Sequence, residues 1–318
     1  MAEKKATATK PKKEQANKGL LRIDGSKSRA KKPAEDQWRN IDNAVKNKTV
    51  VYGVVEAVES EPNLNILTSY DGKQIKIPIN ESGIRLITTP KDKKEETVRL
   101  RQVAVSMIGC KIEFIILGVD KKEDIIIASR EEALNSARVR YYAGDNPRIV
   151  VGSKVEAEVL AVKEKAITVA VFGVDTSIIA RDLRHEWTAD ARDYFAVGDI
   201  IPVEVTKIKF DKTAKNGSKE WCRSLVVEVN AKNLQEDRTI KAYEEAQIEA
   251  RYFGTVTAIN NGTYFMNLAT GANAVAKTNM TNPRTMKGDK VCFVVKKKLE
   301  DSHTLAGIIT RTVASDFK

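Results

Sequence analysis

The sequence predicts an all-β protein built from three tandem five-stranded barrels, joined by short helical connectors and preceded by a disordered, lysine-rich tail. Three observations lead to this fold class. From Thr49 onward the apolar residues fall in short runs rich in Val and Ile, separated by Gly, Asn, Asp and Lys, as is typical of antiparallel strands. These runs recur in three similar units. Residues 1–36, in contrast, contain few bulky apolar side chains.

The N-terminal tail carries most of the excess charge. The 318-residue chain has a formal net charge of +11, and residues 1–34 hold eleven Lys or Arg against three acidic residues, so eight of those charges lie there. Because this segment cannot bury enough apolar surface to offset the entropy of ordering, we expect residues 1–36 to be disordered. Unstructured lysines bind phosphates through counterion release, so the tail should have non-specific affinity for nucleic acid.

The repeated units share three landmarks. Each opens with a strand that contains Gly or Ala and spaced valines or other apolar residues: residues 52–58, 155–162 and 253–259. Each later has a glycine before an alternating strand, and these glycines, Gly109, Gly198 and Gly288, lie 89 and then 90 residues apart. Each closes with a further β run: residues 124–128, 222–229 and 305–310. Five short strands with a long connection before the fourth predict a Greek-key barrel of the oligonucleotide-binding (OB) type.

The helical segments and the repeats set the expected boundaries. A short helix over residues 38–46 should lead into the first barrel, and helix-like stretches near 129–143 and 233–250 should connect the barrels. The expected domains are residues 37–140 with a basic insertion at 84–108, residues 148–232, and residues 246–318.

The opening and closing motifs resemble the S1 domain, the RNA-binding OB module repeated in bacterial ribosomal protein S1. A Gly two places before a Val occurs at Gly53 and Gly254, whereas Ala157 replaces the glycine in the middle unit. The family's closing pattern is matched by residues 109–130. The resemblance covers roughly residues 48–313. It implies binding of single-stranded RNA, with mRNA the expected form, and a role near translation that could include the ribosome as a partner.

The resemblance also implies where RNA would bind. In the family, an aromatic residue on the second and third strands stacks on a base, and a nearby His or basic residue reaches the backbone. An ungapped match from Gly254 places Phe265 at the aromatic position, with Tyr264 and Met266 on the core side. The expected RNA-binding residues are Phe265, Asn267, Lys277, Lys76, Arg181, His185, Lys296 and Lys298.

The first two units depart from the stacking pattern. The middle unit has Lys165 and Thr168 where aromatics are expected and Ile179 at the His position, and the first unit has Leu64 at the aromatic position. The third unit is therefore the expected main platform for RNA.

Several function classes are excluded by the absence of their motifs from the sequence. The chain has no phosphate-binding loop, no G-x-S-x-G and no H-E-x-x-H. Its two histidines have no second ligand at metal-binding spacing, so we expect no metal, cofactor or small-molecule substrate.

No apolar stretch is long enough to span a membrane, and no signal peptide is evident. Three unpaired cysteines in β-like runs, Cys110, Cys222 and Cys292, suit a reducing compartment. We expect a non-enzymatic, cytoplasmic protein.

Three alternatives remain open from the sequence. The barrels could dock on protein, as in a ribosome, polymerase, phage or mobile-element assembly, while the tail alone contacts nucleic acid. OB barrels also bind single-stranded DNA, and the sequence identifies no residue that would contact a 2′-hydroxyl group and so distinguish RNA from DNA. The protein could finally be an accessory subunit that presents substrate to an RNA-degrading or RNA-modifying enzyme. The lack of stacking aromatics in the first two units favours the first alternative.

Overall fold

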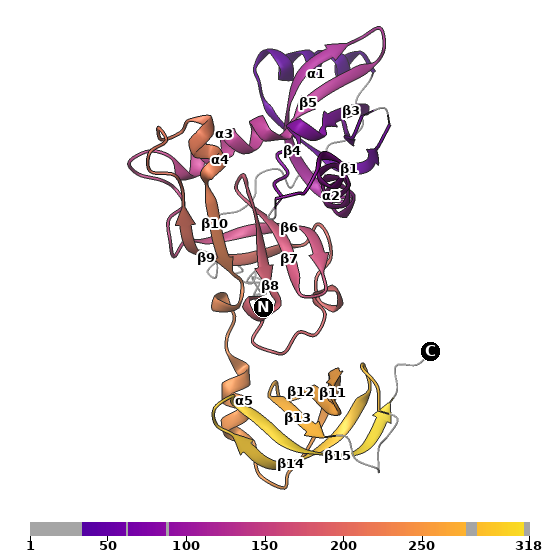
Figure 1. Cartoon of the computed structure of the whole chain (residues 1–318), viewed down its shortest axis with the longest axis vertical. Coiled ribbons are helices and arrows are strands. Elements are labelled where there is room, and N and C mark those ends of the chain that lie inside the picture. The colour runs from indigo at the N-terminus through magenta and orange to yellow at the C-terminus, as the bar shows by residue number, and fades with distance from the viewer. Residues whose placement is uncertain (1–33, 62, 87–88, 278–284, 315–318) are drawn as a thin grey trace, which may run out of the picture.

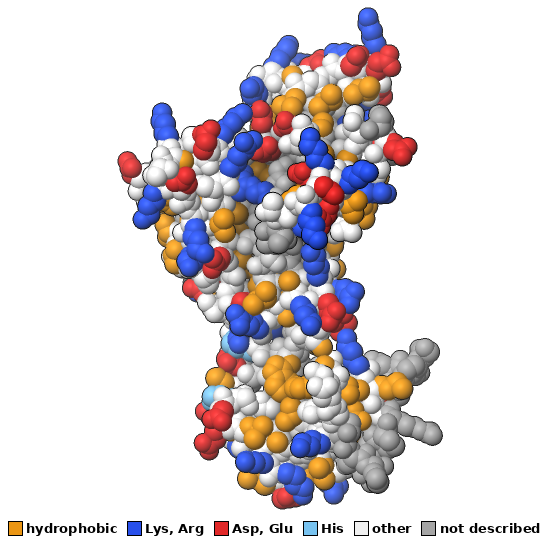
Figure 2. Space-filling view, in the orientation of Figure 1, with side chains coloured by type: hydrophobic (Ala, Val, Ile, Leu, Met, Phe, Trp, Pro, Cys, Tyr) orange, Lys and Arg blue, Asp and Glu red, His pale blue; other side chains and the backbone are white. Residues whose placement is uncertain are grey.

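The chain folds into three successive five-stranded β units (Figure 1). The computed structural model describes residues 34–61, 63–86, 89–277 and 285–314. Nearly all of the predicted tail therefore lies outside the described residues. The first two units pack against each other, and the third is joined to them by a narrow neck (Figures 1 and 2).

The first unit is a closed barrel with strand order β1-β2-β3-β5-β4. Its strands are β1 (Val50–Glu59), β2 (Asn65–Tyr70), β3 (Lys73–Pro78), β4 (Lys111–Asp120) and β5 (Ile125–Ser129). A parallel pairing of Lys76 with Ile127 joins β3 to β5, and the other neighbours are antiparallel. This strand order, with its single parallel pair, is expected for an OB barrel, which removes exposed sheet edges by closure.

Two helices complete the first unit. Helix α1 (Ala34–Lys46) begins inside the segment that sequence reasoning assigned to the tail, and its Ile41 is fully buried against the barrel core. Helix α2 (Lys93–Ser106) forms within the predicted insertion and is capped by Asp92, whose side chain accepts a hydrogen bond from the Glu95 amide at 2.7 Å. Helix α2 thus packs on the barrel, because its Ala104 is buried in the core.

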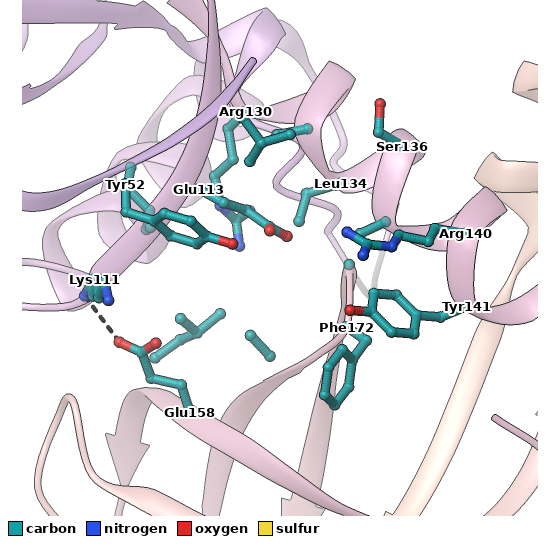
Figure 3. Close-up of a pocket in the computed structure, with 17 residues that line it drawn as sticks. Tyr52, Lys111, Glu113, Arg130, Leu134, Ser136, Arg140, Tyr141, Glu158 and Phe172 are labelled. Atoms are coloured by element: carbon teal, nitrogen blue, oxygen red, sulfur yellow. Dashed lines mark hydrogen bonds between the residues drawn. The ribbon is translucent and has the colours of Figure 1, made fainter. Parts of the chain in front are cut away.

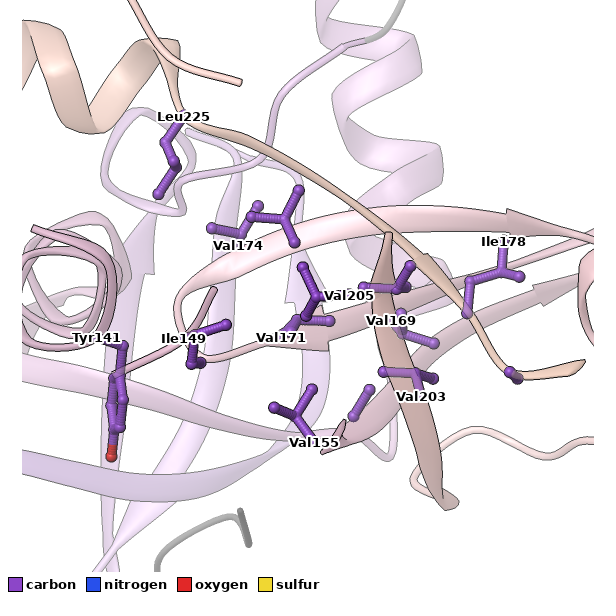
Figure 4. Packing of buried hydrophobic residues seen from close by; sticks show 14 of the residues in the cluster. Tyr141, Ile149, Val155, Val169, Val171, Val174, Ile178, Val203, Val205 and Leu225 are labelled. Atoms are coloured by element: carbon purple, nitrogen blue, oxygen red, sulfur yellow. The ribbon is translucent and has the colours of Figure 1, made fainter. Parts of the chain in front are cut away.

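The second unit repeats the strand order but not the full closure. Its strands are β6 (Lys154–Lys163), β7 (Ala166–Val171), β8 (Val174–Ile179), β9 (Ile200–Lys209) and β10 (Val226–Asn230). They form an open sheet in the order β10-β9-β6-β7-β8, whose end strands β8 and β10 lie near each other. Its core is rich in valines such as Val155, Val169 and Val203, which all point into the same space (Figure 4).

The last β run of the second unit begins later than predicted. The sequence indicated a strand over residues 222–229, but residues 219–224 form helix α4 (Lys219–Ser224). Ser218 caps this helix by accepting a hydrogen bond from the Trp221 amide at 3.2 Å, and Trp221 is buried in the core. Burial of this large side chain favours the helical turn over the strand, and it places Cys222 in a helix. All three cysteines are free and buried.

The third unit is again a closed barrel, in the order β11-β12-β13-β15-β14. Its strands are β11 (Arg251–Asn260), β12 (Thr263–Leu268), β13 (Asn273–Lys277), β14 (Lys290–Leu299) and β15 (Thr304–Ala314). The glycine of the opening motif has a steric reason here. A Cβ atom on Gly254 would lie 2.8 Å from Cδ2 of Leu268 and 3.1 Å from the Asn267 carbonyl oxygen.

Helices connect the units at the predicted places. Helix α3 (Arg130–Tyr142) joins the first unit to the second, and α5 (Arg238–Glu245) joins the second to the third. Within the described ranges, four short 3-10 helices lie in loops: η1 (Ile79–Glu81), η2 (Ala180–Asp182), η3 (Ala191–Asp193) and η4 (Lys232–Leu234). The prediction of three tandem five-stranded OB units with helical connectors is confirmed, with the middle sheet open. Among the described helices, none is both long and apolar enough to cross a membrane.

Helix α3 also holds the first two units together. Arg130, at its start, is almost fully buried and donates hydrogen bonds from Nη1 and Nη2 to the two carboxylate oxygens of Asp175, at 3.0 and 2.9 Å. Nη1 also donates to the Ser82 carbonyl oxygen at 3.0 Å. Across the same boundary, the Lys111 amide donates to Glu158 Oε1 at 2.9 Å. The two units therefore share a buried polar interface.

Candidate nucleic-acid interface

The outward face of the third barrel places an aromatic side chain where nucleic acid would meet an OB sheet. Along β12 the side chains alternate: Tyr264, Met266 and Leu268 are buried in the core, whereas Phe265 and Asn267 lie on the outer face and are half-buried. This alternation follows from the period of two in a strand, and it agrees with the sequence-based placement of Phe265 outside the core.

A second aromatic ring, which sequence reasoning missed, meets Phe265. Trp187 comes from the loop between β8 and β9 of the second unit, and its ring contacts the Phe265 ring edge to face, with centroids 5.3 Å apart and an interplanar angle of 66°. Such contacts are favourable because the positive edge of one ring faces the negative face of the other. Both rings stay half-buried, so each keeps part of its surface accessible.

Two asparagines hold the backbone of Trp187 against the third barrel. Asn267 Nδ2 donates a hydrogen bond to the Trp187 carbonyl oxygen, and the Trp187 amide donates to Asn273 Oδ1, each at 3.2 Å. Asn267 was expected to contact RNA, but in the structure its amide nitrogen donates its hydrogen bond to Trp187 of the second unit. Its Oδ1 is buried and has no hydrogen-bond partner among the described residues.

The segment of residues 184–193, which we call the Trp187 loop, is stabilised by polar contacts within it and by contacts to neighbouring residues. Asp190 pairs with Arg192 through several hydrogen bonds, of which the shortest is 2.6 Å, and these bonds lower the pKa of Asp190 to about 2. The Arg184 guanidinium lies 4.2 Å from the centroid of the Tyr194 ring. Lys287 of the third unit reaches Asp193 at 3.2 Å. The loop therefore has a defined shape and a second tie to the third unit.

Positive charge and another aromatic ring also lie on the outside of the third barrel. Lys277 is exposed on β13, where its strand partner is Thr263, and the residue opposite Phe265 is Val275. Phe253 on β11 is 57% exposed and points to the outside of the barrel, because its neighbour Gly254 faces the core. Figure 2 shows Lys and Arg side chains around the second unit and the neck above this barrel.

Three further predicted RNA-binding residues lie outside the third barrel, and one of them, His185, belongs to the Trp187 loop. Lys76, on the first barrel, pairs with Glu59 at 3.1 Å. His185 Nδ1 lies 2.9 Å from Asp237 Oδ2, which gives this side chain a structural role at the neck. Arg181 is highly exposed on the second unit. Lys76 and Arg181 thus belong to other parts of the first two units, whereas His185 lies two positions before Trp187.

The lysine run on β14 also forms local contacts. Lys296 pairs with Glu249 at 2.8 Å. Lys298 Nζ donates to the Glu244 carbonyl oxygen at 2.8 Å and lies 5.3 Å from the centroid of the Tyr243 ring. Five of the eight predicted residues therefore lie on the third barrel, and the two lysines on β14 take part in these local contacts. In the part of the chain that the structure describes, no group of three or more His, Cys, Asp or Glu side chains could hold a metal.

Comparisons with known proteins give only remote similarities. No protein-family model matches the chain. Similar solved structures include a multidomain protein with nucleic acid binding domains from Streptococcus pneumoniae, at 12% identity over 82% of this chain and 72% of that chain, with a TM-score of 0.18. Another is Drosophila Unr CSD456, at 10% identity over 84% of this chain and 98% of that chain, also with a TM-score of 0.18.

A third similar structure is the tetrameric p202 HIN2, at 11% identity over 52% of this chain and 95% of that chain, with a TM-score of 0.18. At such TM-scores the superpositions do not support conclusions about function. The OB assignment rests instead on the strand order and pairing of the chain itself. The S1 domain remains a resemblance carried by the sequence motifs.

Proposed function

We propose that this protein is a non-catalytic, cytoplasmic RNA-binding protein that holds single-stranded RNA on the outer face of its third barrel. The observation that carries the proposal is the pairing of Trp187 with Phe265 on the outside of an OB sheet, beside the exposed Lys277. A link to translation or to the ribosome is part of the proposal and rests on the resemblance to S1 domains.

The mechanism follows from the chemistry of the two rings. Aromatic faces stack on any base at about 1 to 3 kcal/mol per base, and only a single strand exposes its base faces. A strand that stacks on the half-buried rings of Trp187 and Phe265 would cross from the third barrel to the Trp187 loop. Lys277 would neutralise a phosphate, and the lysine-rich tail would add affinity without sequence preference.

The direct test is salt-dependent binding of a fluorescent single-stranded RNA, measured by anisotropy. Phe265→Ala and Trp187→Ala should each weaken binding by about 1 to 3 kcal/mol, and the double variant should reveal coupling between the two rings. Phe210→Ala is the matched control, because Phe210 is a half-exposed aromatic that also packs on a tryptophan, Trp221, with ring centroids 5.6 Å apart. It should bind RNA like the unmodified protein.

Removal of residues 1–33 separates the tail from the barrel. If the barrel binds RNA, this deletion should mainly flatten the salt dependence and leave the Phe265→Ala effect in place. Competition between RNA and DNA oligomers of the same sequence tests the preference for RNA. Equal competition would favour the single-stranded DNA alternative.

Protein docking remains the second candidate, and one observation favours it. The outer face of the third barrel is already partly covered by Trp187, whose backbone is held by Asn267 and Asn273. If both ring substitutions leave RNA binding unchanged and removal of residues 1–33 abolishes it, the barrels serve to dock protein and the tail alone contacts nucleic acid.

A further inference from the structure

A cavity lies between the first and second units, away from the third barrel (Figure 3). Its volume is about 150 Å³. It is bounded by β1 and β4 of the first unit, by helix α3, and by β6 and the β7–β8 turn of the second unit. An apolar cavity of comparable volume accepts a benzene-sized ring, so one six-membered ring can enter this space.

The walls of the cavity are aromatic and aliphatic. Tyr52 comes from the first unit, Tyr141 from α3 and Phe172 from the second unit, and all three are directed toward the same space in Figure 3. The Tyr141 and Phe172 rings pack together with centroids 4.6 Å apart. Leu134 and Leu160 complete the apolar lining. Such walls suit a flat, apolar-faced ring, because unstacked bases are held by contact with aromatic side chains.

Two polar groups line this cavity, the half-buried Glu113 carboxylate and the buried Arg130 guanidinium. The Glu113 carboxylate points into the space. Burial raises the pKa of Glu113. Arg130 also lines the cavity, and its Nε is buried without a hydrogen-bond partner among the described residues. A buried polar group without a partner costs free energy, so Arg130 Nε would gain from a ligand that accepts its hydrogen bond. The Glu113 carboxylate can accept hydrogen bonds from the same ligand.

The mouth of the cavity is basic. Arg140 and Ser136 line it and are exposed, and the Arg140 guanidinium lies 5.5 Å from the centroid of the Tyr141 ring. A ligand with an anionic group outside and a flat ring inside would therefore meet opposite charge at the entrance.

We propose that this cavity binds a guanine base, with the Watson–Crick edge inside against Glu113 and Arg130 and the phosphate outside at Arg140. Guanine has two adjacent donors, N1–H and the 2-amino group, beside the acceptor O6. A carboxylate is an acceptor-only group that pairs with two adjacent N–H groups, and a guanidinium N–H donates to a carbonyl oxygen. Adenine, cytosine and uracil each place an acceptor beside their donor, which a carboxylate repels. The base could belong to a free nucleotide or to a bound RNA strand.

The first test is calorimetric titration of the full chain with guanosine, adenosine, cytidine and uridine 5′-monophosphates. The guanine nucleotide should bind at least about tenfold more tightly than the other three, as expected for hydrogen bonds to a charged group. Glu113→Gln should remove this preference, because an amide cannot accept both hydrogen bonds. Glu204→Gln is the matched control, since Glu204 is a half-buried carboxylate on β9 and does not line the cavity.

A second variant tests whether a loss of nucleotide binding in Glu113→Gln is caused by misfolding. Arg140→Ala alters an exposed residue at the mouth, and it should bring the affinity for the guanine nucleotide down to that for guanosine, which lacks the phosphate. Retention of the cooperative thermal transition would show that both variants fold. Equal binding of all four nucleotides, or a preference for guanine that survives Glu113→Gln, would overturn the proposal.

RNA oligomers distinguish the two sources of the base. A uridine strand with one guanine should bind more tightly than the same strand with inosine, which lacks the 2-amino group, and Glu113→Gln should remove the difference. If only free nucleotides show the preference, the cavity is a nucleotide site; if only the strand shows it, the base comes from RNA. Absence of the preference in both refutes the cavity site. The strand result rests on the proposed function, whose own failure would appear separately in the Phe265→Ala experiment.

Discussion

Replacement of Asp175 by Asn should expose how strongly the first two units depend on their buried ion pair. The Arg130 side chain is 2% exposed, and Asp175 accepts from both of its terminal nitrogens at 2.9 and 3.0 Å. Asparagine has nearly the same shape but offers one acceptor and no charge. Arg130 would then keep its bond to the Ser82 carbonyl and lose its counterion while it stays buried.

The expected loss is about 3 to 5 kcal/mol in the free energy of unfolding of the first two units, the range for removal of one partner from a buried pair. Urea unfolding followed by circular dichroism measures it, and the third barrel provides a separate transition if it unfolds independently. Glu228→Gln is the control, because Glu228 pairs with Lys209 at 2.7 Å where both side chains are about half exposed. That variant should lose at most about 1 kcal/mol. A loss below about 1 kcal/mol for Asp175→Asn would refute the claim that the pair supports this interface.

Two further predictions concern the third barrel and the Trp187 loop. Gly254→Ala should destabilise the third barrel by about 1 to 3 kcal/mol in urea unfolding, because the new Cβ would lie 2.8 Å from Leu268 Cδ2; an unchanged midpoint would contradict this contact. Hydrogen bonds from Arg192 lower the pKa of Asp190 to about 2, so its stabilising contribution is complete above the ordinary value of 3.8 and lost as pH falls toward 2. The melting temperature of the unmodified protein should therefore fall more between pH 5 and pH 2 than that of Asp190→Asn.

The barrels could be predicted because their signal is local. Strands such as β12 alternate core and outer residues with a period of two, so Tyr264 and Met266 mark the inside and Phe265 the outside without knowledge of the rest of the fold. Local pattern was less reliable at Trp221 and Cys222, where apolar residues that suit a strand form a capped helical turn. There the burial of one large side chain outweighed strand propensity.

The partners of the predicted site residues could not be found in this way. Trp187 and Phe265 are separated by almost eighty positions in the sequence, and the turn-rich loop around Trp187 has no periodic pattern that predicts its destination. Lys76 and Lys296 were predicted as phosphate contacts from their sequence positions, but each has an acidic partner supplied by another segment. Charge in a sequence does not reveal which charges are already paired.

The sequence by itself determined three OB units, their helical connectors and the outward position of Phe265, because hydrophobic periodicity and the positions of glycines act over a few residues. Only the tertiary structure decided that Trp187 lies on the third barrel and that Asn267 holds its backbone. It also decided that Glu113 and Arg130 meet in one cavity. Trp187 and Asn267 come from different units, and the cavity around Glu113 and Arg130 is closed by residues of the second unit, so both sites depend on contacts between residues distant in the chain.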